Sequence, residues 1–452
     1  MADEPKKNVL MVAYDYPPVQ AGGVCRTLKF SKYLPECGWS PHVLTVSNPP
    51  GPRGTDWAPP ELDETVRIHR SRSLELENVV RFLCRRLKRR AETDSALADA
   101  LRWRLGRLWN PLSAPDPLVY WAIPAIPRAL RVIRREGIHA LYSTSWPYSD
   151  HLAALVLHWL TGKPWIADFR DPFTRHYNYG ASSHRKDRFN RWLEAAICRK
   201  ARFVINPTQR ATNQMRADHP DIEPSRFVTI RNGFDEAEFA RPTDLSSHFE
   251  MLHAGSFYLS RRPDLILQAT RCFLRRCPDA EHVTRMTFMG KVEDPCEDFP
   301  FLTVNQWSTR TESIHAICRS RILLLVRHPE CSLTIPGKLY EYMASGNHIL
   351  ALIGRQPELV ELLQSYGNAS ILSFPSVAQL ADQLQILFRR YKAGRLERVP
   401  MSPFVAAFSR RTQTAELAQL LNIAVNRSEV LHPHATALMS TLPHAGCPAR
   451  VA

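Results

Sequence analysis

Short apolar runs alternate with helix-length segments along most of this chain, and this alternation limits the possible folds more than any other feature. In the first half, runs of strand length lie at residues 9–13, 42–46, 66–69, 140–143, 165–169 and 203–206. Helical patterns fill the intervals at residues 26–37, 123–135, 150–160 and 188–199. Strands that alternate with helices build a parallel sheet with helices on both faces. The first half is therefore predicted to be a doubly wound α/β domain.

A second series of the same kind begins after the segment 232–235. Its expected strands are residues 251–254, 286–289, 322–326, 349–353 and 370–372, and its expected helices include residues 263–276, 312–319 and 376–390. A length of 452 residues also exceeds what one hydrophobic core comfortably holds. We therefore expect two Rossmann-like domains that face each other across a cleft at the carboxyl ends of their sheets, where such folds bind ligands.

The pattern also sets the expected domain boundaries. Residues 1–234 would form the N-terminal domain, with a basic helical insertion at 79–108, and residues 235–403 the C-terminal domain. Within the latter, residues 235–249 are acidic and then rich in Ser and Thr, which is typical of a linker. Residues 404–425 are expected to be a final helix. Residues 426–452 have scattered His, Pro and Ala without periodicity, which predicts disorder.

Composition and sequence pattern indicate the cellular location of the protein and the state of its cysteines. No apolar run approaches the ~20 residues that a membrane-spanning helix needs. The first residues lead directly into the strand at 9–13 without a signal-peptide pattern, so we expect a cytoplasmic protein. Ten cysteines are spread over the chain without a CxxC pair, which favours reduced, structural thiols and predicts no metal site.

The segment 335–346 is the most informative motif, because it is predicted to be a turn and a helix ahead of an apolar strand. Gly337 and the free amides of the first helical turn would face the space above the sheet, where an anion can dock. Glu341, one turn further on, can accept hydrogen bonds from a sugar hydroxyl. Together these features predict a nucleotide-sugar pocket. The alternative is that Pro336 only starts a helix and that Glu341 is solvated.

Two glycines, Gly22 and Gly23, lie in the turn between the first expected strand and the following helix. Without side chains, they let backbone amides approach a phosphate closely. The turn does not match GxGxxG, so the dinucleotide-binding fingerprint is absent. The motif alone leaves both a ligand contact and an ordinary tight turn open.

The motifs together resemble those of retaining, GT-B-fold glycosyltransferases of the family 4 type. The matching segments follow the family's usual order between residue 8 and about residue 365. They are residues 9–39, 143–173, 231–239, 252–269 and 335–346. The resemblance implies a GT-B fold and the transfer of a sugar from a nucleotide-sugar donor, with retention of configuration.

The resemblance also implies roles for individual residues. Gly22 and Gly23 would face the donor diphosphate and the acceptor. Glu341 matches the second glutamate of the family's E-x7-E motif, which holds the nucleotide ribose. Eight residues earlier, where the first glutamate belongs, this chain has Leu333. Because that glutamate contacts the donor sugar, the sugar remains open, and so does a catalytically reduced protein.

Cations are expected next to the donor diphosphate. Arg261 or Arg262 resembles the basic residue that neutralises the leaving group, although a solvated helix start is the alternative for both. Lys338, where the loop joins the helix after Gly337, is a further phosphate-binding candidate. Fixed cations and amides stabilise the growing negative charge better than water does. This chemistry implies neither a metal nor a cofactor besides the donor.

His151 and the carboxylates of the segment 168–171 are expected beside the carboxyl ends of the fourth and fifth strands. His151 and Asp171 would there contact the sugar or position the acceptor hydroxyl. The alternative is structural: Asp168 and Arg170 would pair with each other or cap the next helix.

The formal net charge of +15 requires an explanation, and much of it lies in residues 79–108. Nine Arg or Lys residues and three acidic residues fall between Arg81 and Arg107, with leucines at helical spacing and two tryptophans nearby. Such a segment would bind an anionic membrane surface weakly. The alternative is that its leucines pack on the domain and its arginines are solvated. Zinc-ligand spacing and RNP-like aromatic strands are absent, so no nucleic acid is expected.

The sequence therefore predicts a cytoplasmic glycosyltransferase of polysaccharide biosynthesis, and peripheral binding to the inner membrane face is a further expectation. Its expected partners are a nucleotide-sugar donor and a lipid-linked or glycan acceptor. The alternative, which Leu333 favours, is a catalytically reduced nucleotide-sugar-binding or scaffold subunit of a glycan-assembly system.

Overall fold

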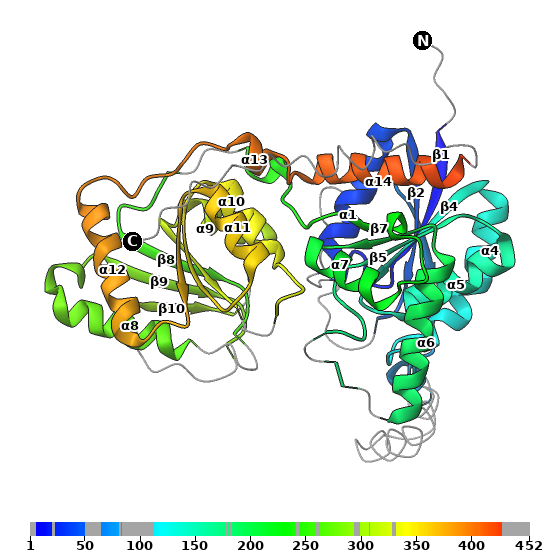
Figure 1. The fold of residues 1–452 in the computed structure, drawn as a ribbon, viewed down its shortest axis with the longest axis horizontal. Helices are drawn as coiled ribbons and strands as arrows, with labels where there is room; N and C mark the ends of the chain where they lie inside the picture. The colour runs from blue at the N-terminus through cyan, green and yellow to red at the C-terminus, as the bar shows by residue number, and fades with distance from the viewer. Residues whose placement is uncertain are drawn as a thin grey trace, which may run out of the picture.

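The computed structural model contains two α/β domains joined along one side (Figure 1). It describes residues 6–19, 23–49, 65–80, 83, 113–176, 179–180, 183–240, 244–257, 263–292, 299–306, 308–327 and 331–426. The strands of both sheets pair in parallel, and helices alternate with them along the chain. The predicted fold class, two Rossmann-like doubly wound domains, is confirmed.

The first domain is built on a seven-stranded sheet in the order β3-β2-β1-β4-β5-β6-β7. Its strands are β1 (Lys7–Val12), β2 (Trp39–Val46), β3 (Arg67–Ser71), β4 (Ile138–Ser145), β5 (Trp165–Phe169), β6 (Phe203–Asn206) and β7 (Phe227–Thr229). Its helices are α1 (Val24–Tyr33), α4 (Ala122–Arg135), α5 (Ser149–Thr161), α6 (His184–Lys200) and α7 (Gln209–Asp218). The strand order reverses between β1 and β4, which makes this pair the topological switch point.

The second domain is built on a six-stranded sheet in the order β10-β9-β8-β11-β12-β13. Its strands are β8 (Phe249–Ala254), β9 (Thr284–Met289), β10 (Leu302–Asn305), β11 (Ile322–Val326), β12 (His348–Ile353) and β13 (Ala369–Ser373). Its helices are α8 (Asp264–Arg276), α9 (Arg310–Arg319), α10 (Gly337–Ser345), α11 (Pro357–Tyr366) and α12 (Val377–Lys392). The switch point lies between β8 and β11.

The central strands of each sheet are buried on both faces, and they are nearly continuous apolar runs. In β1, Leu10 and Val12 join the core under α4 and α5, whereas Val9 and Met11 join the core on the opposite face. This alternation is the two-residue period of a strand. In β11, Leu323 and Leu324 are divided between the two cores of the second sheet in the same way.

The end of the described chain returns to the first domain. After α12, the short helix α13 (Pro403–Ala406) lies at the junction, and α14 (Arg410–Val425) crosses the first domain (Figure 1). Leu417 and Leu421 of α14 are fully buried in the same core as Phe30 of α1. The single helix predicted at 404–425 is thus two helices.

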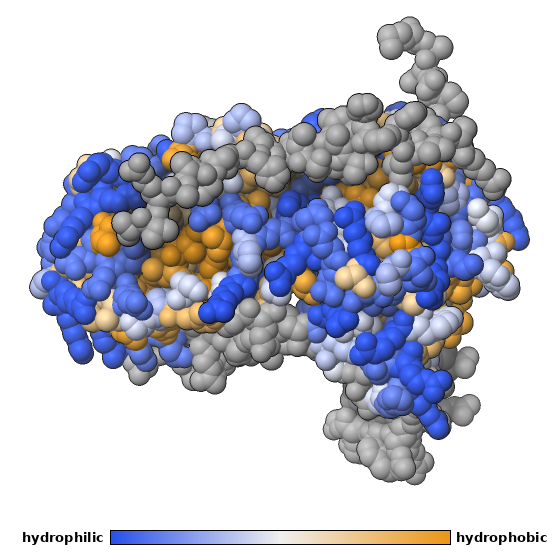
Figure 2. All heavy atoms as spheres, viewed as in Figure 1, coloured by the Kyte–Doolittle hydropathy of each residue, from blue (hydrophilic) through white to orange (hydrophobic). Residues whose placement is uncertain are grey.

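Several expectations fall on residues that the structure leaves undescribed. They concern Gly22, Arg261, Arg262, most of the insertion at 79–108, and residues 427–452. Within the described ranges, no helix has both the length and the hydropathy needed to cross a membrane. Figure 2 shows hydrophilic residues over most of one face of both domains, with hydrophobic residues exposed in a hollow of the second domain.

Candidate functional site

The carboxyl edges of the two sheets meet at the domain junction. Thr208, just after β6, donates its Oγ1 hydroxyl to the backbone carbonyl of Leu333, in the loop after β11, at 2.9 Å. Glu358, in the first turn of α11, accepts the backbone N–H groups of Gln209 and Arg210 at 3.0 Å each. These amides form the amino end of α7, which favours a negative charge. The contacts hold the carboxyl edges of the two sheets against each other.

Lys338 reaches the switch point of the second sheet. Its Nζ lies 3.3 Å from His253 Nε2, and His253 Nδ1 lies 2.9 Å from the carbonyl oxygen of Leu324. Because a carbonyl only accepts, Nδ1 carries the imidazole proton and Nε2 accepts from the Lys338 ammonium. The half-buried cation is thereby held at the carboxyl end of β8.

Two glycines make room for this arrangement. Gly255 follows β8 with a φ of +137°, and a Cβ atom there would lie 2.6 Å from Lys338 Nζ. Gly290 follows β9 with a φ of +139°, and its Cβ would lie 2.6 Å from the carbonyl carbon of Gly255. Both positions need a backbone conformation that side chains rarely adopt, and both lack space for a side chain. Glycine therefore lets the two strand ends and the lysine approach closely.

The amino end of α10 is open. Among the described residues, no side chain caps this helix, and a Cβ at Gly337 would meet no heavy atom within 4 Å. The first amides of an α-helix have no partner inside the helix and carry a partial positive charge. The uncapped amides thus lie next to Lys338 at this helix start, and the binding of an anion to Gly337 and Lys338 stays a prediction.

Glu341 takes part in a chain of ion pairs that joins the two domains. Its Oε1 lies 2.7 Å from Arg310 Nη1, at the start of α9, and its side chain is 15% exposed. Arg310 Nη2 lies 2.6 Å from Glu238 Oε2, and Glu238 Oε1 lies 2.9 Å from Lys29 Nζ in α1. Burial alone would raise the pKa of Glu238, but Arg310 and Lys29 hold that pKa below its usual value. Glu341 is therefore not solvated, and that alternative is wrong.

The segment that enters the second domain is bound to α1. Asp235 accepts from Lys29 Nζ at 2.7 Å, from Lys32 Nζ at 3.0 Å and from the Tyr33 hydroxyl at 2.5 Å. Burial opposes ionisation of Asp235, but the hydrogen bonds from Lys29 and Tyr33 outweigh it and lower the pKa of this carboxyl. These contacts bind the first residue of the expected linker to α1.

The glycine turn of the first domain lies beside Arg170. A Cβ at Gly23 would lie 1.6 Å from Arg170 Nη1, so this guanidinium fills the space next to the turn. Cys25 lies two residues further along the chain. Burial raises the pKa of its thiol, Arg310 lowers it, and Glu341 raises it. Since both charges reach Cys25, the junction brings the start of α1 close to Glu341.

Asp171, just after β5, faces the second domain. Burial raises the pKa of this carboxyl, whereas Arg170, His176 and Arg327 lower it. Arg327 belongs to the second domain, where its Nη2 donates to the carbonyl and the hydroxyl of Thr334 at 2.7 and 2.8 Å. Asp171 is therefore close enough to the second domain for the charge of Arg327 to act on it, and its contact with a substrate stays a prediction.

His151 occupies a different place from the one expected. Its side chain is 0% exposed, its Nδ1 lies 2.7 Å from Ser143 Oγ, and its ring centroid lies 4.6 Å from that of Phe169. Burial is the main cause that lowers the pKa of His151 to about 3, so the imidazole is neutral. The structure places this histidine in the core and not with Asp171 at the junction.

Asp168 is also buried. It pairs with Arg26 at 2.7 and 3.1 Å and accepts the Tyr142 hydroxyl at 2.5 Å. The suggested pairing of Asp168 with Arg170 is therefore wrong. Arg170 instead donates to the backbone carbonyl of Trp146 at 2.7 Å.

Sequence reasoning missed three polar residues of the site. His253 and Arg310 hold Lys338 and Glu341, and Asp150, in the first turn of α5, accepts the Tyr14 backbone N–H at 2.8 Å. Burial raises the pKa of Asp150 well above its usual value. The Thr-x-x-Glu capping box at residues 309–312 signals the helix that begins at Arg310, but no local pattern shows which carboxylate this arginine contacts.

Within the described residues, no group of three or more His, Cys, Asp or Glu side chains is arranged to hold a metal ion.

Comparison with known proteins agrees with this architecture. Residues 21–233 match the sequence model of the family described as glycosyl transferase 4-like domain. No curated protein matches the chain.

Solved structures share the whole fold. A glycosyltransferase from Rickettsia africae has a TM-score of 0.57 at 12% identity, over 94% of this chain and 100% of that chain. Anabaena HepE, in complex with UDP and glucose, has a TM-score of 0.57 at 14% identity, over 92% and 99%. Sucrose-phosphate synthase from Thermosynechococcus elongatus has a TM-score of 0.55 at 12% identity, over 96% and 100%. At these identities the likeness establishes the fold alone. The resemblance to GT-B glycosyltransferases of the family 4 type is confirmed.

Proposed function

We propose that this chain, which carries a glycosyl transferase 4-like domain over residues 21–233 of a GT-B fold, transfers a sugar from a nucleotide-sugar donor to an acceptor hydroxyl. Family and fold support glycosyltransferase activity. The donor class is supported by the chemistry of the junction, and by the UDP-glucose bound to Anabaena HepE. Retention of configuration is carried over from the family resemblance.

The observation that carries this proposal is the placement of Lys338 and Glu341 on one helix. Lys338 reaches the switch point beside Gly255, where doubly wound sheets bind ligands. Glu341 lies three residues on, so it occupies the same side of α10. A diphosphate would bind the ammonium and the open amides of the helix, and the ribose hydroxyls would donate to the carboxylate.

The reaction then needs charge stabilisation more than a protein nucleophile. The bond between the sugar C1 and the diphosphate oxygen breaks, a bond forms between C1 and the acceptor oxygen, and the proton of the acceptor hydroxyl passes to the departing diphosphate. Negative charge grows on the leaving diphosphate, where Lys338 and the amides of α10 are already in position. Asp171, on the opposite side of the junction, is our candidate for positioning the acceptor hydroxyl. No step of this scheme requires a metal ion.

The proposed acceptor is lipid-linked or a glycan, reached by a protein that is peripheral on the cytoplasmic membrane face. The charge of +15 and the basic insertion support this part. Co-sedimentation with anionic liposomes at low salt tests it, and failure to sediment removes the membrane association.

A second candidate is a nucleotide-sugar-binding subunit with reduced catalysis. Leu333 replaces the glutamate expected to hold the donor sugar, and its carbonyl accepts a hydrogen bond from the first domain at 2.9 Å. The residue is half-buried at the junction, and its side chain has no group that could accept from a sugar hydroxyl. Binding of a nucleotide sugar without transfer or hydrolysis would favour this candidate.

A thermal-shift screen against nucleotide sugars tests the function without knowledge of the acceptor. We expect one donor to raise the melting temperature of the wild type and the same donor to fail with Lys338→Gln. Lys392→Gln is the matched control, because Lys392 is an exposed lysine of the same domain, paired with Asp279. Equal shifts in all three proteins would remove the proposed donor site. Transfer assays with the selected donor then separate the two candidates.

A further inference from the structure

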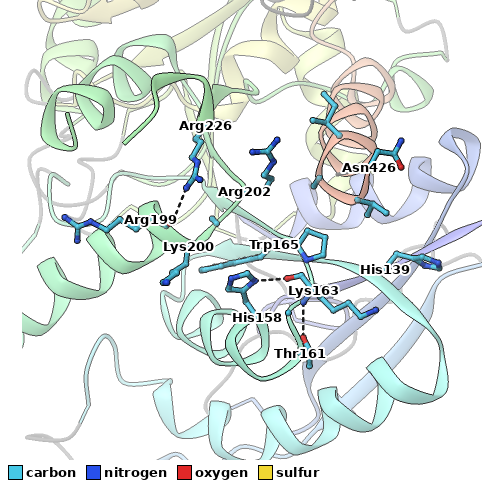
Figure 3. Close-up of a pocket in the computed structure, with 16 residues that line it drawn as sticks. His139, His158, Thr161, Lys163, Trp165, Arg199, Lys200, Arg202, Arg226 and Asn426 are labelled. Atoms are coloured by element: carbon cyan, nitrogen blue, oxygen red, sulfur yellow. Dashed lines mark hydrogen bonds between the residues drawn. The ribbon is translucent and has the colours of Figure 1, made fainter. Parts of the chain in front are cut away.

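A cavity of about 650 Å³ lies at the amino edge of the first sheet, away from the domain junction. Its walls come from the residues that enter β4, β5, β6 and β7 and from the carboxyl end of α14 (Figure 3). The strands β4, β5 and β6 contain eight, five and four residues. At ~3.3 Å per residue, they put the cavity about 13–26 Å from the carboxyl edge, so it is separate from the proposed donor site.

The cavity is strongly basic. Five of its lining residues carry a permanent positive charge, and the described lining includes no carboxylate. They are Lys163, Arg199, Lys200, Arg202 and Arg226. Arg199 pairs with Asp221 at 3.2 Å, where both side chains are more than half exposed, so solvent weakens this neutralisation. The cavity therefore keeps a positive potential.

Backbone contacts organise its walls. Arg226 Nη1 donates to the backbone carbonyl of Arg199 at 3.0 Å, which fixes one guanidinium at the rim. His158 Nδ1 lies 2.7 Å from the carbonyl of Lys163, which ties the end of α5 to the loop before β5. Figure 3 shows Lys200 and Arg226 on one side of Trp165, Arg202 above it and Lys163 on the other side, whereas the Arg199 guanidinium is turned away from the other cations. The basic residues of the lining therefore come from two sides of the cavity.

Apolar groups complete the site. Pro164, Ala201, Ile423 and Val425 contribute to the lining between the cations. On the last turn of α5, next to two lining residues, Trp159 is 80% exposed and Leu160 is 49% exposed. An exposed tryptophan beside basic residues is typical of groups that meet a membrane interface.

We propose that this cavity binds a phosphate-bearing anion, either a free phosphate compound or the headgroup of an anionic phospholipid. Guanidinium and ammonium groups form charge-assisted hydrogen bonds with phosphate oxygens. The volume lies within the range of small-molecule sites, and the apolar lining accepts the carbon part of a phosphate ester. The inference is independent of the proposed transfer reaction, because it concerns the opposite edge of the sheet.

The test is a titration with sodium pyrophosphate at constant ionic strength, followed by calorimetry. The triple variant Lys163→Gln, Lys200→Gln, Arg202→Gln removes three charges without breaking a hydrogen bond described above. The matched control is Arg389→Gln, Arg395→Gln, which neutralises two exposed arginines of the second domain. The single variant Lys200→Gln, at an exposed position, provides a second measurement should the triple variant unfold.

We expect the wild type and the control to bind pyrophosphate and the triple variant to bind it roughly tenfold more weakly or worse. Sedimentation with anionic phosphatidylglycerol vesicles is then compared with sedimentation with neutral phosphatidylcholine vesicles. This comparison tells whether the bound phosphate belongs to a lipid headgroup or to a free compound. Loss of vesicle binding in the triple variant assigns the lipid headgroup, and unchanged or absent vesicle binding assigns the free anion. The proposal is overturned if the wild type binds neither probe. It is also overturned if the cavity variants bind both pyrophosphate and the vesicles like the wild type, which would leave the donor site as the site of pyrophosphate binding.

Discussion

The neutral replacement Glu341→Gln tests the donor site most directly, because it keeps the size of the side chain and removes its charge. One carboxylate oxygen lies 2.7 Å from Arg310 Nη1, and in the proposed complex the other accepts from ribose hydroxyls. A hydrogen bond to a charged acceptor contributes about 1.5–3 kcal/mol, and one to a neutral acceptor about 0.5–1.5 kcal/mol. For two hydroxyls the variant therefore loses ~2–3 kcal/mol, or roughly 30- to 150-fold in affinity.

The loss of binding should not come from unfolding. Arg310 keeps a second carboxylate, that of Glu238 at 2.6 Å, so the variant does not leave this guanidinium unpaired. We expect the free energy of unfolding to fall by about 1 kcal/mol, well below the 3–5 kcal/mol typical of a broken buried pair. Urea denaturation monitored by circular dichroism measures this difference.

Calorimetry with a nucleoside diphosphate and its 2′-deoxy analogue separates a ribose contact from a general effect. Removal of the 2′-hydroxyl should weaken binding to the wild type much more than binding to Glu341→Gln, because the variant has already lost the charged acceptor. Glu361→Gln, an exposed position of the same domain, is the control and should behave like the wild type. If the deoxy penalty is the same in all three proteins, Glu341 does not hold the ribose.

Three further changes test other parts of the argument. Gly255→Ala forces a side chain into a φ of +137° and places a Cβ 2.6 Å from Lys338 Nζ. We expect it to cost about 1–3 kcal/mol of stability and to weaken nucleotide binding, as a melt and a titration would detect. Burial raises the pKa of Glu416 from 4.5 to about 7, so between these values the folded state binds more protons than the unfolded state and stability falls as pH rises. Glu416→Gln should remove that fall, worth up to about 3 kcal/mol above pH 7, and parallel stability–pH curves for variant and wild type would contradict this. Asp171→Asn should reduce transfer about 100-fold or more at an unchanged donor KM, whereas wild-type rates would exclude a role for Asp171 in the reaction.

The strands that the sequence predicted best are those buried on both faces. Residues 165–169, 203–206 and 322–326 were predicted with the bounds that the structure has, because a strand covered on both sides is a continuous apolar run. The strands β7 and β10 were missed. The first has only three residues, and three of the four residues of the second are exposed, so neither has the apolar run on which the prediction depended.

In the candidate site, features that depend on neighbouring residues could be predicted, whereas contacts between residues far apart in the sequence could not. The open helix start at Gly337 could be predicted, because a Pro-Gly turn before a helix is a short-range signal. The contact of Glu341 with Arg310 could not, since 31 residues separate them and only the packing of α9 against α10 brings them together. His151 shows the reverse error. A position after a strand suggested access to substrate, whereas the first turn of α5 directs this side chain into the core.

The ion pairs at the junction have a physical consequence for any ligand that binds Glu341. This carboxylate shares Arg310 with Glu238, and Glu238 shares Lys29 with Asp235, so one chain of alternating charges runs from α10 through α9 to α1. A ribose that donates to Glu341 withdraws part of its negative charge from Arg310, which strengthens the remaining pair with Glu238. Glu238 lies on the segment that connects the domains and is tied to the first domain through Lys29. Donor binding in the second domain would therefore change the electrostatic contacts that fix the first domain, and no rearrangement of either core is needed for that coupling.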